Sequence, residues 1–214
     1  MTDKEQNYFE NKLSSNWSYR EDDELRLFLE SKVQSLYNDI STNANKEKDL
    51  EHEDIYSGNL GIAYMYWLLS KQPFIKDKML ESEVCLSKAR AIVVDVMEGL
   101  KRSGIDRGHS FLFGNCGIIL MAGLVFNATQ EDKYRDHYFG LLVKFSGHYL
   151  NFNWDDNRIH TLYEGIPGFL CCAQWANYCT NTHIIPVETM QNIVISVMKC
   201  GLKSLYIPEK RLIL

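Results

Sequence analysis

The sequence predicts an all-α fold built from repeated pairs of helices, arranged as a partial α/α toroid or an α-solenoid. A Gly-x-x-Gly motif occurs three times, and each copy follows an aromatic residue and precedes an apolar stretch of helical length. A longer amphipathic stretch follows each apolar one. Helices that are apolar all round are buried, whereas helices with one apolar stripe keep a face in water. The repeat therefore predicts apolar inner helices and amphipathic outer helices.

The composition is that of a globular protein and excludes several function classes. The chain has 214 residues, of which 45% are hydrophobic and 24% are charged, so it is long enough to bury a core. A net charge of −5 without a clustered basic face gives no reason to expect nucleic-acid binding. The apolar runs are about half the length of a spanning helix, so no transmembrane segment is expected.

The first twenty residues and the cysteines indicate a cytoplasmic protein. Residues 1–20 are polar and are expected to form a flexible N-terminus. They contain no apolar core of a signal peptide, so we expect a cytoplasmic location with reduced cysteines. Residues 21–214 are expected to form the helical-pair domain.

The first predicted helix spans about residues 24–40. Its apolar residues recur at three- and four-residue spacing, which places them on one face, and Glu21, Asp22 and Asp23 favour its N-terminal end. This helix is the candidate cap for the N-terminal end of the repeats, and residues 41–53 form a polar linker. The apolar face comprises Leu25, Phe28, Leu29, Val33, Leu36, Tyr37 and Ile40.

The three motifs mark the starts of the predicted inner helices. Their second glycines are 56 and then 51 residues apart. Glycine allows a positive φ where the chain turns into a helix, and it removes a side chain where helix starts crowd together. The six glycines are Gly58 and Gly61, Gly114 and Gly117, and Gly165 and Gly168.

The predicted outer helices span about residues 80–101, 131–150 and 187–203. Each carries apolar residues at helical spacing on one side. These are Val84, Ile92, Val93, Val96, Met97 and Leu100 in the first helix; Tyr134, Tyr138, Leu141, Leu142, Phe145 and Tyr149 in the second; and Ile193, Val194, Val197 and Leu202 in the third.

The motif-bearing segments resemble those of the LanC-like (lanthionine synthetase C-like) protein family. Tyr56–Gly61, Phe111–Gly117 and Leu162–Gly168 are similar to the first three of the seven repeats in that family's α/α barrel. Gly168-Phe169-Leu170-Cys171-Cys172-Ala173 is similar to the third repeat of the eukaryotic branch. The resemblance covers about residues 21–207 and implies a partial LanC-like α/α barrel with about three repeats.

The resemblance implies a zinc-dependent activity that adds the thiol of glutathione to dehydroamino acids in peptides or proteins. In the family, a cysteine and a Cys-His pair in later repeats hold the zinc, which favours the thiolate nucleophile. This sequence contains no Cys-His and no His-Gly dipeptide and ends at Leu214, and Ile166 stands where many members have arginine. We therefore expect a truncated chain with no catalytic residue, no zinc of its own and no activity alone.

Two other functions are compatible with the pattern. The chain could be a non-catalytic binding or scaffold protein that presents the surface of a three-repeat arc. A glycosidase-like toroid is the more distant alternative, because α/α toroids also host glycoside hydrolysis and Asp155, Asp156 and Glu164 are carboxylates close in sequence. Adjacent aspartates flanked by Asn153 and Asn157 are more typical of a polar turn.

Several residues can be interpreted as either structural or functional. Cys171, Cys172 and Cys179 are better read as buried core thiols than as a metal site, since structural zinc favours short Cys-x-x-Cys spacings. His109 and His160 precede the second and third motifs and are better read as solvated loop residues than as cavity ligands. The aromatic residues of the inner helices are better read as core than as a stacking platform.

The last predicted helix pair has no following repeat in this sequence. Repeat arrays need covered ends, so the apolar side of the third inner helix, including Phe169, Leu170 and Trp175, is expected to face water. Exposed apolar patches of several hundred Å² promote association. We therefore predict that the isolated chain is poorly stable or self-associating.

Overall fold

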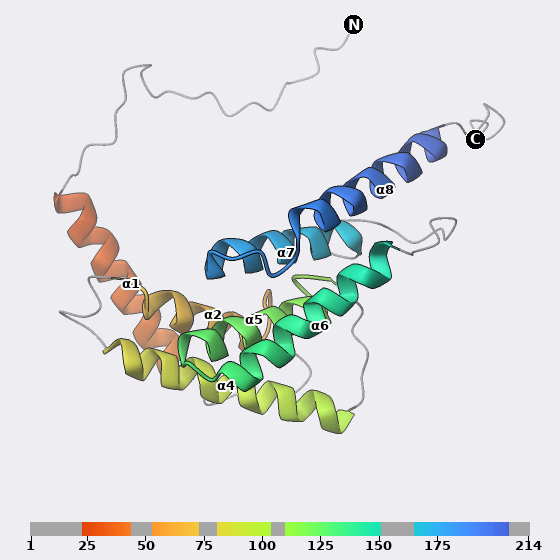
Figure 1. Cartoon of the computed structure of the whole chain (residues 1–214). Coiled ribbons are helices and arrows are strands. Elements are labelled where there is room, and N and C mark those ends of the chain that lie inside the picture. The colour runs from red at the N-terminus through yellow and green to blue at the C-terminus, as the bar shows by residue number, and fades with distance from the viewer. Residues whose placement is uncertain (1–22, 44–52, 73–80, 104–109, 151–164, 206–214) are drawn as a thin grey trace, which may run out of the picture. The chain divides into compact units, whose positions relative to one another are not determined.

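The computed structural model describes residues 23–43, 53–72, 81–103, 110–150 and 165–205. These ranges contain seven α-helices and no strand, which confirms the predicted all-α class. The chain divides into two compact units, Met1–Thr42 and Asn43–Leu214. The helices are α1 (Asp23–Asn43), α2 (Asn59–Leu69), α4 (Ser82–Ser103), α5 (Asn115–Ala128), α6 (Asp132–Leu150), α7 (Ile166–Thr180) and α8 (Val187–Leu205), as Figure 1 shows.

The first unit is represented by α1. Its 21 residues confirm the predicted first helix, which continues slightly beyond the expected end. The proposed role of this helix as a cap stays a prediction. Residues 1–20 and most of the 41–53 linker lie outside the described residues.

Within the second unit, the Gly-x-x-Gly motifs mark helix starts as predicted. Helices α2, α5 and α7 begin directly after Gly58, Gly114 and Gly165, so their first residues are also 56 and 51 positions apart. The amphipathic stretches fold as α4, α6 and α8. The alternation of apolar and amphipathic helices is thus present in all three pairs.

Helix α5 forms the centre of the core. Every residue from Cys116 to Phe126 is buried, because α5 packs against α2, α4, α6 and α7 (Figure 1). Tyr64 of α2 and Trp175 of α7 also meet, with ring centroids 6.4 Å apart. Helix α5 thus has the burial expected of a helix that is apolar all round. Helix α2 is equally apolar, but only five of its 11 residues are buried.

The amphipathic helices bury one face each, which confirms part of the predicted faces. The predicted residues that are buried are Val93 and Val96 of α4, Tyr138, Leu142 and Tyr149 of α6, and Ile193 of α8. Helix α4 buries Cys85, Ala89, Val93 and Val96, at helical spacing. Val84, Tyr134 and Val194, which were predicted on the apolar sides, are each about two-fifths to one-half exposed. The prediction was wrong there because apolar spacing defines a broad stripe, and contacts with the neighbouring helix decide which edge of it is covered.

The first glycine of each motif is the N-cap of its helix, but the expected positive φ occurs only once. Gly58 and Gly114 have φ values of −115° and −117°, which side chains also adopt. Gly165 alone has a positive φ of 113°. The prediction of positive φ was therefore wrong for two of the three motifs, and their first glycines are not explained by backbone conformation.

The second glycine of the motif is required by close packing. A Cβ added to Gly61 would lie 2.6 Å from the carbonyl oxygen of Ile55, and one added to Gly117 would overlap the carbonyl oxygen of Phe111. In both cases the contacted carbonyl belongs to the residue six positions earlier. The glycine therefore does remove a side chain at a crowded helix start. The predicted cause was wrong, because the close contact is with the preceding loop and not with the start of another helix.

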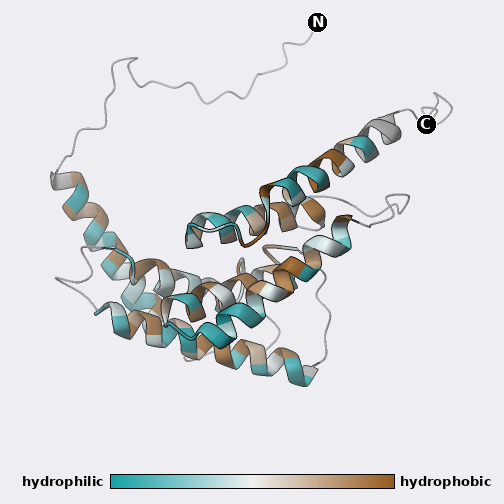
Figure 2. Cartoon of the chain, in the orientation of Figure 1, coloured by the Kyte–Doolittle hydropathy of each residue, from teal (hydrophilic) through white to brown (hydrophobic). Residues whose placement is uncertain are grey.

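The third pair is more exposed than the other two. Phe169 was predicted to face water, but it is fully buried and its ring centroid lies 4.7 Å from that of Tyr149 on α6. That prediction was wrong because Phe169 lies on the side of α7 that meets the second pair. Tyr178 of α7 is 75% exposed and Met198 of α8 is 62% exposed. Figure 2 shows apolar and polar residues alternating along α8, near the C-terminus.

None of the helices in the described ranges combines the length and apolar character needed to cross a membrane.

Candidate functional site

The loops that precede the first two motifs are built alike. The side chain of Asp54 accepts a hydrogen bond from the Ser57 N–H at 2.6 Å, and the hydroxyl of Ser110 accepts one from the Phe113 N–H at 3.4 Å. Both residues are buried, and they are 56 positions apart, as the helix starts are. Such side chain-to-backbone turns fix the approach of the loop to its helix.

These two turn residues were not singled out from the sequence, although a signal was present. Asp54, Ser110 and Thr161 occupy the same position in the three repeats, and all three are residues that bond to nearby backbone groups. Thr161 lies outside the described residues.

The first two loops also contact each other. The N–H groups of Ile55 and Tyr56 both donate to the carbonyl oxygen of Leu112, at 3.2 and 3.4 Å. The rings of Tyr56 and Phe113, the aromatic residues before the first glycines, form an edge-to-face pair with centroids 5.2 Å apart. Tyr56 is 68% exposed, so this end of the inner helices presents an aromatic surface.

The cysteines have contrasting environments. Cys172 is fully buried and its thiol donates to the carbonyl oxygen of Cys116 at 3.3 Å. Burial raises the pKa of the Cys116 thiol to about 12 and raises that of Cys172 well above its ordinary value. Cys179 is half-buried, and burial raises its pKa while the nearby Lys71 opposes that effect. These thiols are protonated at neutral pH and are therefore poor nucleophiles.

The core-thiol interpretation is only partly right. It is confirmed for Cys172 and wrong for Cys171, which is exposed because consecutive residues of a helix point in different directions. No group of three or more histidine, cysteine or acidic side chains within the described ranges has the arrangement of a metal site. His109, His160, Asp155, Asp156 and Glu164 lie outside those ranges.

The aromatic residues of the inner helices are mostly core, as predicted. Tyr66 and Trp67 of α2 are buried, and the Lys71 ammonium lies 3.8 Å from the centroid of the Trp67 ring. The indole N–H groups of Trp67 and Trp175 are buried without a hydrogen-bond partner. Tyr178 is the exception to the core assignment, because its ring is largely in water.

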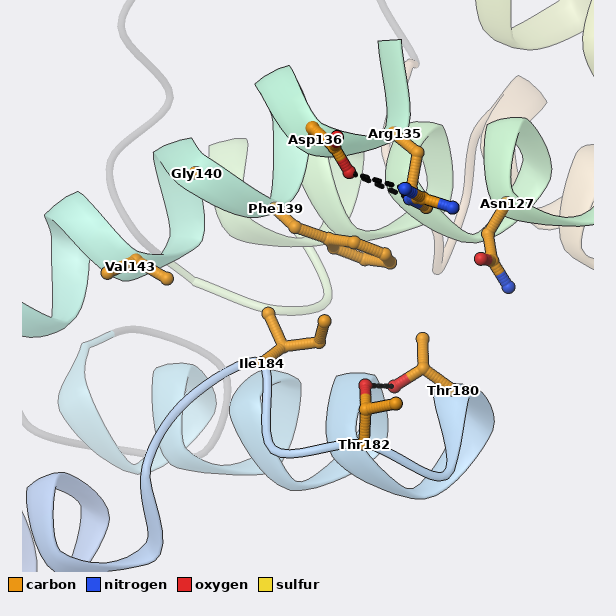
Figure 3. Close-up of a pocket in the computed structure, with 9 residues that line it drawn as sticks. All are labelled: Asn127, Arg135, Asp136, Phe139, Gly140, Val143, Thr180, Thr182 and Ile184. Carbon is orange, nitrogen blue, oxygen red and sulfur yellow. Dashed lines mark hydrogen bonds and ion pairs between the residues drawn. The ribbon is translucent and has the colours of Figure 1, made fainter. Parts of the chain in front are cut away.

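A surface groove of about 400 Å³ separates α6 from the loop that joins α7 to α8 (Figure 3). The α6 side contributes a ridge of residues over two helical turns, and the opposite wall comes from the end of α7 and the following loop. Figure 3 shows Phe139 and Ile184 reaching toward each other across it. The residues that line the groove are Asn127, Arg135, Asp136, Phe139, Gly140, Val143, Thr180, Thr182 and Ile184.

Local structure positions the polar groups at the rim. The Arg135 guanidinium bonds to a carboxylate oxygen of Asp136 at 2.8 Å and to one of Asp132 at 2.6 Å. Thr180 shares a hydrogen bond with Thr182 through their hydroxyl groups, at 2.8 Å. The groove therefore combines an apolar floor with hydrogen-bonding walls, the usual composition of a ligand site. None of its residues was singled out from the sequence, because the groove exists only where the second and third pairs meet.

No family model matches the chain.

Proposed function

We propose that the chain forms three inner–outer helix pairs of a LanC-like α/α toroid and belongs to a protein that adds thiols to dehydroamino acids. The observation that carries the proposal is the matched geometry of the first two motifs. In each, the first glycine is the N-cap, and the second packs on the carbonyl of the residue six positions earlier. A repeated geometry of this kind supports a solenoid or toroid of equivalent units.

In this proposal the chain provides framework and no catalytic group. The chemistry needs a thiolate, which zinc ligation favours at neutral pH. The described cysteines whose pKa is shifted all have it raised, which is the opposite of what a zinc-free nucleophile would need. Zinc and glutathione would be held mainly by the family's later repeats, which this sequence does not contain.

The proposal is tested with three proteins: this chain, the zinc-holding portion of a LanC-like protein, and a fusion of the two. Each is incubated with glutathione and a dehydroalanine peptide, and the thioether product is measured by mass spectrometry. We expect the chain alone to match the buffer control and to hold no stoichiometric zinc, and we expect the fusion to form product. A fusion that folds and binds zinc but forms no more product than the zinc-holding portion would refute the proposal.

A non-catalytic binding protein is the second candidate. The observation that favours it is the groove between the second and third helix pairs, which offers a binding surface without catalytic groups. This candidate predicts ligand binding by the chain alone and no effect of the fusion on activity.

A further inference from the structure

We propose that α8 pairs in antiparallel orientation with the α8 helix of a second copy of this chain. The contact surface is a largely apolar stripe along α8, called the α8 stripe, which comprises Val187, Gln191, Val194, Ile195 and Met198. The inference goes beyond the proposed function and does not depend on it, because it follows from the exposure, spacing and charge of one helix surface.

The α8 stripe is in water, although α8 packs against α6 and α7 through another side. Ile193, on the packed side, is fully buried, whereas the four apolar side chains of the stripe are between 41% and 62% exposed. Helix α4 exposes only Val84 among its described large apolar side chains. Apolar side chains gathered on one exposed face are typical of a surface that a partner covers.

The spacing of the α8 stripe is that of a helix pair. Val187, Gln191, Val194 and Met198 are separated by four, three and four residues, which is the spacing of the a and d positions along the seam of a coiled coil. In an antiparallel pair, the a positions of one helix oppose the d positions of the other. One register then places Val187 opposite Met198 of the second copy and Gln191 opposite Val194. The stripe is therefore complementary to itself, as a two-fold interface requires.

Two charged residues favour the antiparallel orientation. Glu188 and Lys199 each follow a stripe residue by one position, so they lie along the same edge of the stripe. Both are exposed. Antiparallel pairing brings Glu188 of one copy near Lys199 of the other at both ends of the contact, whereas parallel pairing would bring like charges together.

The same two charges argue against a membrane surface as the partner of the α8 stripe. Glu188 and Lys199 are the only charged residues of Val187–Lys199. A helix that lies on an anionic membrane carries several lysines or arginines on its polar face. The balanced pair of charges on α8 instead matches a second copy of the same helix.

This proposal assigns self-association to a different helix from the one that the sequence predicts. The expected surface was the apolar side of α7, but Phe169 is buried on that helix. The exposed apolar residues of the third pair lie mainly on the outer helix α8.

The first pair of variants is Met198→Glu and its matched control Tyr178→Glu. Each replaces a largely exposed apolar residue with a glutamate, so the change in net charge is the same. Tyr178 belongs to α7, where its ring centroid lies 5.7 Å from that of Trp175, and it is outside the α8 stripe. Because both positions are in water, both variants should fold, and circular dichroism checks that they do.

A second set of variants tests the orientation and does not depend on Met198→Glu. It consists of Glu188→Lys, Lys199→Glu and the double variant with both changes. In the antiparallel pair each single change brings like charges together, whereas the double variant brings opposite charges together again. In a parallel pair none of the three variants would behave in this way.

The experiment is sedimentation velocity of the full chain and its variants at concentrations from about 1 to about 200 µM. The average mass should rise with concentration from one chain toward two. Met198→Glu should weaken dimerisation about tenfold or more, and Tyr178→Glu should leave it unchanged. Each single charge reversal should weaken it about threefold to tenfold, and the double variant should restore it.

Four outcomes would overturn the proposal. They are a monomer over the whole concentration range, growth beyond two chains, equal effects of the two glutamate variants, and a double charge variant as weak as the single ones. A monomer at all concentrations would mean that the α8 stripe is covered by something other than a second copy.

Discussion

The first two helix pairs and the third pair share one sequence pattern but differ in how fully they are buried. Helix α5 of the second pair has inner-helix neighbours on both sides, α2 and α7, and its central residues are all buried. Helix α7 buries the side that meets α5 and α6, while Cys171 and Tyr178 are exposed. The motif therefore specifies where a helix starts, and the neighbours determine how many of its faces are covered.

The backbone geometry of the motifs also separates the first two helix pairs from the third. Gly58 and Gly114 cap their helices with nearly identical extended backbones, whereas Gly165 has a positive φ and is followed by Pro167. The third motif is thus a variant of the repeat and not a copy. Three predictions test the contrast between the pairs, beginning with the largest expected effect.

The largest contrast is expected between two adjacent cysteines of α7. At pH 8, exposed Cys171 should react readily with iodoacetamide. Buried Cys172 and Cys116 should react about a thousandfold more slowly, because burial raises the pKa of both thiols well above the ordinary value and little thiolate forms. Tandem mass spectrometry of timed samples distinguishes the two α7 thiols. Equal rates in the folded protein would contradict the described packing of α7, and equal rates in urea serve as the control.

The second contrast compares the close-packed glycines. Gly117→Ala should lower the free energy of unfolding by about 3 kcal/mol, and Gly61→Ala should lower it by about 1–2 kcal/mol, because forcing a methyl group against backbone costs energy that only structural shifts relieve. Gly117 meets both the Phe111 carbonyl and the Ile55 side chain, whereas Gly61 meets only the Ile55 carbonyl. Urea unfolding measures both values.

The control for these two variants is Gly147→Ala. Its added Cβ meets no atom within 4 Å, so the higher helix propensity of alanine should raise stability by about 0.5–1 kcal/mol. If Gly117→Ala were as stable as Gly147→Ala, the result would contradict the close contact between Gly117 and the preceding loop.

The smallest effect concerns an ion pair that joins the first pair to the second. Arg90 of α4 bonds to Glu131, which precedes α6, at 2.7 Å, and this hydrogen bond lowers the pKa of Glu131 below its ordinary value of 4.5. A carboxylate whose pKa is lowered by folding stabilises the protein above its unfolded pKa. That contribution is lost as the pH falls through the folded pKa.

Glu131→Gln should therefore be less stable than the wild type by about 0.5 kcal/mol at pH 7, since the pair is partly exposed. The difference should shrink as the pH is lowered below 4. Thermal melting of both proteins from pH 3 to pH 7 gives the comparison. A difference that stays constant over this range would mean that Glu131 contributes through packing and not through its charge.

The sequence by itself determined the helices and their repeat. Apolar periodicity and the glycine spacing located α2, α5 and α7 and their amphipathic partners, because helix formation and burial depend on local patterns with a fixed period. The sequence also contained the signal for the turn residues Asp54 and Ser110. That signal is visible only when the repeats are aligned, because it consists of similar residues at the same position of each repeat.

The tertiary structure alone decided which faces are covered and where the groove lies. Phe169 is buried and Cys171 is exposed on the same apolar helix, and the period of a helix does not indicate which side meets a neighbour. The groove brings Phe139 of α6 together with Ile184 of the α7–α8 loop, which are 45 residues apart in the chain. Contacts between segments so distant depend on how the pairs pack, and that packing is decided by side-chain shape across the interface between the pairs.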